Sequence, residues 1–327
     1  SERQLGENVH FAKSHFGYDA SWVSGCLLPF HHTFATVSDV LPVLCAGGRV
    51  VVAPGFQPTD AGALAAVFTQ YNVNSFSSVP VVLDAWMALS VSLPDSLRFV
   101  ITGASPLSER TRTRYAARYG HPVVPCYGLT ESVCFAAASP VGGGKPGAVG
   151  RAAGIQIRVL GPDLSPISGG ETGEIALKGA SVITEGYFRI PDATDEPFLE
   201  DGWFLTGDMG HEDADGYVYI TGRRKNMLIR GGEKVYLEEL DRCLEAHPGV
   251  AEACAVQVPG RFGYDRAVAF VVAAGDIPDT ASIRAHVRAR MGPIGSPDDV
   301  VWVSRIPKSA TGKPLRAALR DGYPEAA

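Results

Sequence analysis

The stretch "CYGLTES" at residues 126–132 brings together residue types that can contact a nucleotide. Tyr127 could stack on a flat ring, Thr130 could hydrogen-bond a phosphate oxygen, and Glu131 could ligate Mg²⁺ through oxygen. A polar turn with a helix-capping threonine explains the same residues equally well. Taken alone, the stretch leaves a binding loop and a structural turn open.

Asp208 and Arg223 favour a nucleotide-binding loop over a purely structural turn. Asp208 follows a glycine, so its carboxylate can approach a sugar diol and accept two hydrogen bonds. Arg223 adds a permanently charged planar fork that suits ribose and phosphate oxygens. The two residues together predict a nucleotide that is held by its sugar.

Lys313 lies between Gly312 and Pro314, and these neighbours predict an exposed loop. A lysine on a surface turn is usually only a solvated charge. From this stretch alone, that interpretation of Lys313 is favoured.

The glycine-rich stretch "VGGGKPGAVG" at 141–150 looks like a phosphate-binding loop around Lys145. Pro146 stands where a phosphate loop needs Ser or Thr for magnesium, and it prevents a helix from starting cleanly behind the lysine. We therefore predict a flexible connector.

Short apolar runs such as "LRFVIT" (97–102) alternate with helix-like segments such as 34–46 and 108–119 from residue 20 to 130, and this predicts a parallel α/β sheet. Ligands bind beyond the carboxyl ends of such strands, where residues 126–132 would lie. Gly- and Pro-punctuated strands then predict a small β-rich subdomain. After Gly222, "VYLEELDRCLEAH" and "TASIRAHVRARM" predict helices of a C-terminal α+β domain. The predicted domains are 1–222, divided into 1–144 and 145–222, and 223–327.

Composition limits the class of partner. The 327 residues are 46% hydrophobic, enough for roughly two domains with their own cores. The net charge of -6 provides no basic field for nucleic acid or an anionic membrane. No apolar run approaches the ~20 residues of a membrane helix, and no signal peptide precedes Ser1. Because position 1 is not Met, we expect a trimmed or partial chain.

The cysteines occur singly in apolar surroundings, with no C-x-x-C pair. We therefore expect reduced, buried thiols in a cytoplasmic protein. They are Cys26, Cys45, Cys126, Cys134, Cys243 and Cys254.

Six motifs occur in the order and approximate spacing of the AMP-forming adenylating superfamily. They are "TGASPLS" (102–108), "YGLTES" (127–132), "GEIALKGASVITEGYF" (173–188), "GWFLTGD" (202–208), "GRRKNMLIRGGEKV" (222–235) and "PKSATGK" (307–313). The chain thus resembles, over essentially its whole length, a superfamily of acyl- and aryl-CoA synthetases, nonribosomal-peptide adenylation domains and luciferase. The resemblance implies that a carboxylic acid is activated as acyl-AMP with ATP and Mg²⁺. The acyl group then passes to coenzyme A or to the phosphopantetheine of a carrier protein.

The resemblance also implies roles for the residues that match these motifs. It places the adenine beside Gly103, Ala104, Ser105, Tyr127 and Gly128. It places the α-phosphate and the magnesium ion at Thr130 and Glu131. The ribose would bind Asp208 and Arg223. Lys313 would lie between the substrate carboxylate and the α-phosphate and stabilise negative charge there. With six motifs in order, the solvated-lysine interpretation of Lys313 is no longer favoured.

In this superfamily the C-terminal domain swings about a hinge between the two half-reactions. The resemblance assigns the hinge to Lys225 and the path of the incoming thiol to Arg230, Gly231 and Gly232. An ordinary hairpin turn at 231–232 is compatible with that assignment.

"LPFHHTFA" at 28–35 resembles the acyl-site motif of the superfamily, with His32 as the matched histidine. Phe34, Val79 and Cys126 are expected to line the acyl pocket, although core packing is an alternative for Phe34. No Asp stands in the motif to hold an ammonium, so we expect an acid without an α-amino group. A mostly apolar pocket closed by small residues suits an aryl or medium-chain acid.

The N-terminal half of the superfamily, with its phosphate loop, has no counterpart in the chain. Three accounts remain: a fragment of a complete synthetase, a short enzyme that handles acyl-AMP or a thioester without ATP, or a non-catalytic AMP-binding module. In the last account a separate chain could supply the N-terminal half. We favour the first account. No carrier domain follows Ala327, so we expect an external thiol, with coenzyme A ahead of an acyl carrier protein.

Overall fold

The computed structural model places the chain in two compact units, described separately below. One comprises residues 1–206 and 210–220, and the other residues 207–209 and 221–327. The structure describes residues 1–53, 55, 58–183, 186–187, 197–199, 201–230, 233–260, 265–309 and 312–323.

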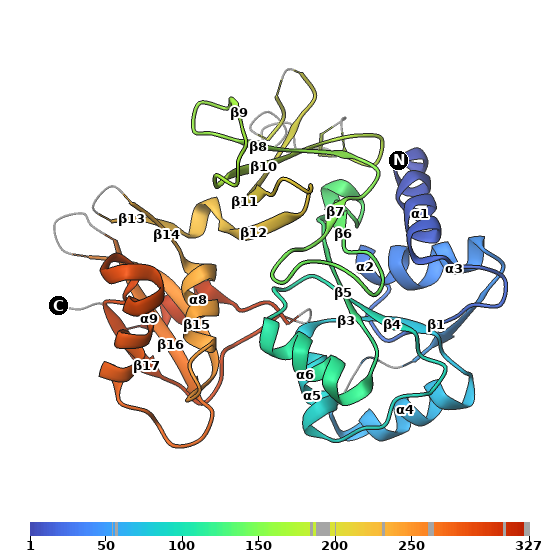
Figure 1. The fold of residues 1–327 in the computed structure, drawn as a ribbon, viewed down its shortest axis with the longest axis horizontal. Coiled ribbons are helices and arrows are strands. Elements are labelled where there is room, and N and C mark those ends of the chain that lie inside the picture. The colour runs from blue at the N-terminus through green and yellow to red at the C-terminus, as the bar shows by residue number, and fades with distance from the viewer. Residues whose placement is uncertain are drawn as a thin grey trace. The chain divides into compact units, whose positions relative to one another are not determined.

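The central sheet of the first unit has the strand order β2-β1-β3-β4-β5-β6-β7 (Figure 1). Its strands are β1 (Val23–Cys26), β2 (Arg49–Val52), β3 (Ser75–Ser78), β4 (Phe99–Thr102), β5 (Val123–Tyr127), β6 (Ala137–Ala138) and β7 (Arg151–Ala152). Strands β1 to β5 pair in parallel, while β5, β6 and β7 pair antiparallel. The predicted parallel sheet is confirmed, and β5 ends at the predicted binding loop.

Helices cover both faces of this sheet. They are α1 (Glu2–Phe16), α2 (Thr33–Ala35), α3 (Leu41–Cys45), α4 (Ala61–Gln70), α5 (Pro80–Ala88) and α6 (Glu109–Tyr119). On β4, Val100 packs in the cluster formed with α4, α5 and α6. Its neighbours Phe99 and Ile101 pack in the cluster formed with α1 and α3. This alternation follows from the period of two in a β-strand.

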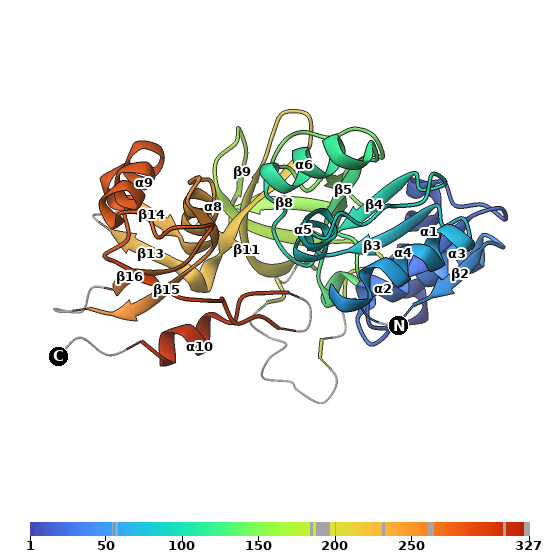
Figure 2. The ribbon, with the colours of Figure 1, turned by 90° about the horizontal axis from the view of Figure 1, so that it is seen from below.

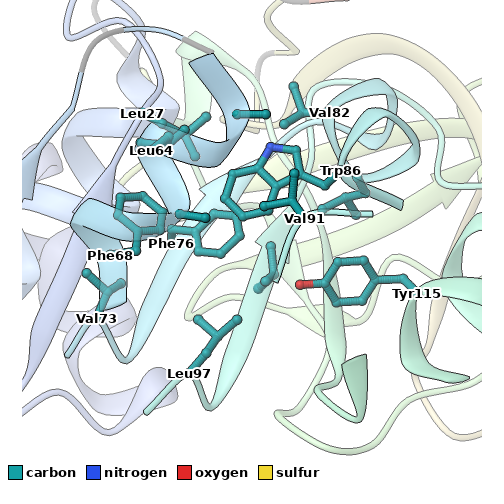
Figure 3. Packing of buried hydrophobic residues seen from close by; sticks show 14 of the residues in the cluster. Leu27, Leu64, Phe68, Val73, Phe76, Val82, Trp86, Val91, Leu97 and Tyr115 are labelled. Carbon is teal, nitrogen blue, oxygen red and sulfur yellow. The ribbon is translucent and has the colours of Figure 1, made fainter. Parts of the chain in front are cut away.

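Three aromatic rings form the centre of the core beneath α4 and α5 (Figure 3). The centroid of the Phe76 ring lies 5.3 Å from that of Phe68 and 5.4 Å from that of Trp86. All three side chains are fully buried. Such ring pairs each add about 0.5–1.5 kcal/mol beyond the burial of their area. The core therefore fixes β3, whose carboxyl end leads to Val79.

A π-helical segment, η1 (Thr36–Val40), interrupts the single helix that the sequence predicts over 34–46. The N–H of Leu41 bonds to the carbonyl of Thr36, five residues back. Pro42 follows and has no N–H with which to continue the α-helical pattern. The proline therefore accounts for the departure from a regular helix.

Asp39 on η1 is a fully buried carboxyl group that sequence reasoning did not single out. The hydroxyl of Ser77 donates to its Oδ1 at 2.7 Å, and the hydroxyl of Ser24 lies 3.5 Å from the same oxygen. Burial raises the pKa of Asp39 well above its usual range. The neutral carboxyl is the favoured form at this position.

A second sheet has the order β12-β11-β10-β8-β9, in agreement with the predicted β-rich region. Its strands are β8 (Gln156–Leu160), β9 (Pro166–Ile167), β10 (Gly173–Lys178), β11 (Phe204–Glu212) and β12 (Val218–Arg223). Strand β10 pairs antiparallel with β8, with Glu174 opposite Leu160. Strands β11 and β12 are neighbours, so Asp208 and Arg223 lie on adjacent strands.

Within its described residues, the second unit combines a hairpin, a three-stranded sheet and three α-helices. They are η4 (Arg224–Asn226, a 3₁₀ turn), β13 (Met227–Arg230), β14 (Glu233–Tyr236), α8 (Leu237–Glu245), β15 (Val250–Pro259), β16 (Asp265–Ala273), α9 (Thr280–Gly295), β17 (Asp299–Trp302) and α10 (Arg316–Asp321). Figure 2 shows α8 and α9 on one side of β15 and β16, and α10 on the other. Alternate residues such as Ala255 and Val256 on β15 face the two sides.

The expectation that all six cysteines are buried is wrong for Cys45, which is exposed at the end of α3. Cys126 is half-buried, and the other four thiols are buried. All six are free thiols, in agreement with the absence of paired cysteine motifs. No helix within the described part of the chain is long and apolar enough to cross a membrane.

Candidate nucleotide and acyl sites

The loop after β5 needs a glycine at Gly128. A Cβ atom there would lie 1.4 Å from the carbonyl oxygen of Cys134, so no other residue fits without moving the backbone. The carbonyl of Tyr127 accepts a hydrogen bond from the N–H of Ala136 at 2.8 Å, which turns the chain back along β5. Thr130 then begins a short 3₁₀ turn, and its side chain is exposed.

Glu131 is held in place by Tyr187, which lies 56 residues further along the chain. The hydroxyl of Tyr187 donates to Glu131 Oε1 at 2.8 Å. Desolvation, together with the hydrogen bond to Glu131, raises the pKa of Tyr187 to about 12, so the phenol remains a donor at neutral pH. The second carboxylate oxygen can therefore serve a metal ion.

The turn that follows Glu131 contains a strained residue. Val133 has φ 66° and ψ -59°, and the N–H of Cys134 bonds to the carbonyl of Ser132 at 2.8 Å. This is a γ-turn with a positive central φ, which is rare for a β-branched residue and costs of order 1–3 kcal/mol. The surrounding contacts hold Val133, just after Thr130 and Glu131, in a backbone conformation that the residue rarely adopts alone.

Gly103, Phe34 and Cys126 converge at the carboxyl end of β4. A Cβ atom on Gly103 would lie 2.8 Å from Cys126 Sγ and 3.4 Å from the ring of Phe34. The thiol of Cys126 donates to the carbonyl of Thr102 at 3.2 Å, which fixes its direction. Phe34 is buried, so it belongs to the core as well as to this group. Two of the predicted acyl-pocket residues thus meet beside a predicted adenine residue.

The other residues predicted for this region lie around that group. Ala104 has φ 63°, an uncommon value for a residue with a Cβ atom, and packs against both core clusters. Val79 is buried on the α4–α6 side of the sheet, and His32 is half-buried just before α2. Among the described residues, the buried Ser105 Oγ has no hydrogen-bond partner. An unpartnered hydroxyl here is suited to a bound polar group such as a purine.

Asp208 and Arg223 form an ion pair in the second unit. Arg223 Nε lies 2.6 Å from Asp208 Oδ1, and the side chains are 42% and 4% exposed respectively. Gly207, with φ 70°, allows the bend that precedes Asp208. The carboxylate is buried, and the ion pair with Arg223 supplies the opposite charge that a buried carboxylate needs.

Lys313 lies within electrostatic reach of this ion pair. Desolvation and then the positive charge of Arg223 lower the pKa of Lys313, while the carboxylate of Asp208 raises it. The Lys313 carbonyl accepts from Ser309 N at 2.9 Å, and its own N–H donates to Ser309 Oγ at 3.2 Å. The residue as a whole is exposed, as the sequence predicts, while its amine is partly desolvated. The effects of the Arg223 and Asp208 charges on its pKa group Lys313 with the predicted ribose residues.

The predicted hinge and thiol-path residues have separate surroundings. Lys225 is exposed in the η4 turn. The guanidinium of Arg230 donates to the carbonyls of Ile294 and Ser296, at 3.0 and 2.8 Å, and pairs with Asp298. Arg230 is therefore anchored to the C-terminal end of α9. Gly231 and Gly232 lie outside the described residues.

Lys145 binds carboxylates and not phosphate. Its amine lies 2.6 Å from Asp213 Oδ2 and 2.5 Å from Asp215 Oδ2. These two contacts raise the pKa of Lys145. The rejection of 141–150 as a phosphate loop thus agrees with the contacts of its lysine.

The residues suit a magnesium ion that is carried by a nucleotide. Within the described parts of the chain, no group of three His, Cys, Asp or Glu residues could hold a metal. Mg²⁺ usually binds through one or two carboxylates, with phosphate oxygens and waters completing its shell. Glu131, oriented by Tyr187, provides one such carboxylate.

Sequence reasoning missed Tyr187 and the contacts of Arg316. Tyr187 lies inside the motif at 173–188, so its position was visible, but nothing in the sequence connects it to Glu131. Arg316 follows Lys313 by three residues and binds Asp241 on α8. Both contacts join segments far apart in the chain, which neither spacing nor periodicity can reveal.

Curated relatives of this chain include several CoA ligases. The sulfoacetate–CoA ligase of Cupriavidus necator is 35% identical over 297 residues, which are 89% of this chain and 57% of that protein. The indoleacetate–CoA ligase of Aromatoleum aromaticum is 33% identical over 90% of this chain and 58% of its own length. The chain thus spans less than two thirds of the length of these relatives.

Solved structures share the fold. ATP-bound MatB from Rhodopseudomonas palustris matches with a TM-score of 0.89 at 30% identity, covering 99% of this chain and 64% of that one. The amide bond synthetase McbA from Marinactinospora thermotolerans also gives a TM-score of 0.89, at 27% identity over 98% of this chain and 65% of its own.

Family models match most of the chain. The model of the AMP-binding enzymes matches residues 2–188, and that of their C-terminal domain matches residues 239–313. These segments contain the Gly103, Glu131 and Lys313 regions described above. The chain belongs to the AMP-binding enzymes, the AMP-forming adenylating superfamily.

Proposed function

We propose that the protein is an acid–thiol ligase that activates a carboxylic acid as acyl-AMP and transfers the acyl group to coenzyme A. The observation that carries this proposal is the buried Asp208 carboxylate, paired with Arg223 and within electrostatic reach of Lys313. This set offers acceptors to a ribose diol and positive charge to a neighbouring phosphate. Membership of the AMP-binding enzymes supports the same chemistry.

The first half-reaction joins the acid to AMP. A carboxylate oxygen of the substrate attacks the α-phosphorus of ATP, the bond to the bridging oxygen breaks, and pyrophosphate leaves. Lys313 stabilises the negative charge that gathers on the oxygens around the phosphorus. Glu131, held by Tyr187, and Thr130 contact the α-phosphate region. Mg²⁺, when bound, neutralises phosphate charge.

The second half-reaction releases AMP. The thiolate of the acceptor attacks the acyl carbonyl, the bond from that carbon to the phosphate oxygen breaks, and AMP departs with both electrons. Lys225, as the hinge, and Arg230, Gly231 and Gly232, on the path of the thiol, are the residues that we assign to this step. Coenzyme A is the favoured donor, with the phosphopantetheine of an acyl carrier protein second.

The surroundings of Gly103 favour an apolar acid. Phe34 and Cys126 present a ring and a thiol beside a backbone that has no room for a Cβ atom. Such a lining suits an aryl or medium-chain acid better than acetate or an amino acid. Among the relatives, one is named for indoleacetate and another, 34% identical, is a feruloyl-CoA synthase, which is consistent with an aryl acid.

A panel of acids tests the proposal. Benzoate, a phenylpropenoate, octanoate, acetate and phenylalanine are each offered with ATP, or as synthetic acyl-AMP, together with coenzyme A or carrier protein. The acyl thioester is detected by mass. We expect aryl or medium-chain acids and coenzyme A to give the most product. If phenylalanine outperforms every other acid, the pocket assignment is wrong.

The same experiment separates the alternatives. In the full-length protein, thioester from acyl-AMP but none from ATP would identify an enzyme that handles acyl-AMP without ATP. From the 327-residue chain alone, the same result is also expected of a fragment that lacks the phosphate loop. AMP binding with no thioester from either source would identify a non-catalytic AMP-binding module. Turnover with carrier protein but none with coenzyme A would reverse the order of acceptors.

A further inference from the structure

We propose that Arg316 is a positioning residue that anchors the Lys313 hairpin to helix α8 and thereby sets the place of the Lys313 amine. The hairpin comprises the described residues 306–309 and 312–316. This inference rests on the proposed function, because it assigns Arg316 an effect on the step that Lys313 assists. It concerns only residues of the second unit.

Arg316 ties the end of the hairpin to two other elements. Its guanidinium lies 2.5 Å from Asp241 Oδ2 on α8, and it donates to the carbonyl of Ala255 on β15. The same group lies 3.4 Å from Cys254 Sγ. The Arg316 side chain is only 18% exposed, whereas arginine side chains are mostly exposed to solvent. A mostly buried guanidinium with this many partners restricts the movement of its own backbone.

The hairpin transmits this anchor to Lys313. Leu315 N donates to the carbonyl of Pro307 at 2.8 Å, and Lys308 and Pro314 form an antiparallel bridge. On the opposite arm, Lys308 Nζ lies 2.9 Å from Glu252 on β15. Both arms are therefore pinned to the body of the unit, with Lys313 three residues from Arg316.

Glu238 connects the anchor to the ribose residue Arg223. Glu238 Oε1 lies 3.5 Å from the Arg316 guanidinium and accepts from Asn226 Nδ2 at 2.5 Å. Its Oε2 accepts from the backbone N–H of Arg223 at 3.2 Å. A Cβ atom on Gly222 would lie 2.6 Å from this oxygen, so the glycine leaves room for the carboxylate. One side chain thus touches both segments that carry the predicted active-site cations.

The test compares Arg316→Met with a matched control on the same helix. Arg320→Met removes an exposed arginine from the same helix. Among the ion pairs of the described residues, Arg320 has only the one with its neighbour Asp321. Since Arg316→Met leaves Asp241 buried without its partner, Arg316→Met is also made together with Asp241→Asn. Arg316→Lys keeps the positive charge but lacks the several N–H donors of the planar guanidinium. It should therefore lose less activity than Arg316→Met but be less active than wild type.

Kinetics of the two half-reactions give the first measurement. We expect Arg316→Met to slow acyl-AMP formation about 10-fold or more, and to change thiolysis of supplied acyl-AMP less than about twofold. In a Lys313→Ala background, Arg316→Met should have no further effect, because the two residues act through one amine. The proposal would be overturned if Arg316→Met slowed both half-reactions equally. It would also be overturned if Arg316→Met slowed acyl-AMP formation by the same factor in wild type and in the Lys313→Ala background.

Backbone hydrogen exchange gives the second measurement and requires no turnover. Amides of the hairpin, including those of Ser309 and Leu315, should exchange about 10-fold faster in the Arg316→Met, Asp241→Asn protein than in wild type. Arg320→Met should leave them unchanged. Unchanged exchange in the first variant would refute the anchor. If Lys313→Ala leaves acyl-AMP formation intact while exchange still rises, the proposed function fails and the anchor stands.

Discussion

Arg223 Nε lies 2.6 Å from Asp208 Oδ1, and the carboxylate is almost entirely buried while the guanidinium is partly exposed. A buried charge of this kind is costly unless it is paired, and the arginine supplies that pairing. We regard this ion pair as the centre of the proposed nucleotide site.

In a complete version of the enzyme, Lys313→Ala should slow acyl-AMP formation about 10²-fold or more, because the role proposed for the amine is to stabilise charge in that half-reaction only. Thiolysis of a supplied acyl-AMP should stay within about twofold of wild type. Rapid-quench measurement of each half-reaction checks both rates, with Lys13→Ala on α1 as the control. An equal loss in both half-reactions would remove the role assigned to Lys313.

Tyr187→Phe should raise the Mg²⁺ concentration needed for half-maximal acyl-AMP formation about 10-fold, since Glu131 loses the 2.8 Å hydrogen bond that orients it. A magnesium titration of the rate provides the measurement. Tyr219→Phe is the matched control, because it removes a hydroxyl that donates to Asp213 at 3.3 Å. Identical magnesium curves for Tyr187→Phe and wild type would show that Glu131 does not depend on this bond.

The second unit should lose stability as pH rises, through Glu245. Burial, and then the charge of Asp241, raises the pKa of Glu245 to about 7. A carboxyl with a raised folded-state pKa binds its proton more tightly when folded. The contribution of Glu245 to the free energy of unfolding is complete below ~4.3, the pKa of a glutamate in the unfolded chain. It is lost as the pH rises through the folded-state pKa of about 7.

We therefore expect the free energy of unfolding to fall by about 2 kcal/mol between pH 5 and pH 8. Glu245→Gln should flatten this dependence and be the more stable protein at pH 8. Urea unfolding across that range measures the slope, and Glu233→Gln on β14 serves as an exposed control. Parallel profiles for Glu245→Gln and wild type would contradict the assignment.

The 327-residue chain should bind AMP at least as tightly as ATP. Its assigned residues address the adenine, the ribose and the α-phosphate, and none in this sequence is assigned to the β- and γ-phosphates. Titration calorimetry with each nucleotide measures the two dissociation constants. ATP binding tighter than AMP by about tenfold, or ~1.4 kcal/mol, would show that a further phosphate-binding group had been overlooked.

Much of the secondary structure could be predicted because its local signals agree with its packing. The run "LRFVIT" became β4 at Phe99–Thr102, and the helix predicted over 108–119 runs from Glu109 to Tyr119. Ser108 caps that helix by accepting from Thr111 N at 3.0 Å, and Gly120, with φ 74°, ends it. The π-helical hydrogen bonding of η1 could not be predicted: Pro42 marks a disturbance of the helix, but the pattern of apolar residues is that of an ordinary helix.

The site was only partly visible in the sequence. Short motifs name Asp208, Glu131 and Lys313 because each needs a local backbone shape that glycines mark. The partners that orient them are invisible at that level: Tyr187 reaches Glu131 across 56 residues, and Arg316 reaches Asp241 across 75. The roles of the assigned residues therefore stay predictions until they are measured.

Recognition of the ribose diol is the most direct test of the nucleotide site. The chain is titrated calorimetrically with AMP and with 2′,3′-dideoxyadenosine monophosphate, first as wild type and then as Asp208→Asn. Asp163→Asn, which alters an exposed carboxylate bonded to Ser165, is the control. We predict that wild type and the control bind AMP at least about tenfold more tightly than the dideoxy analogue, and that Asp208→Asn abolishes this difference. Equal affinities of the wild-type chain for the two nucleotides would contradict the account.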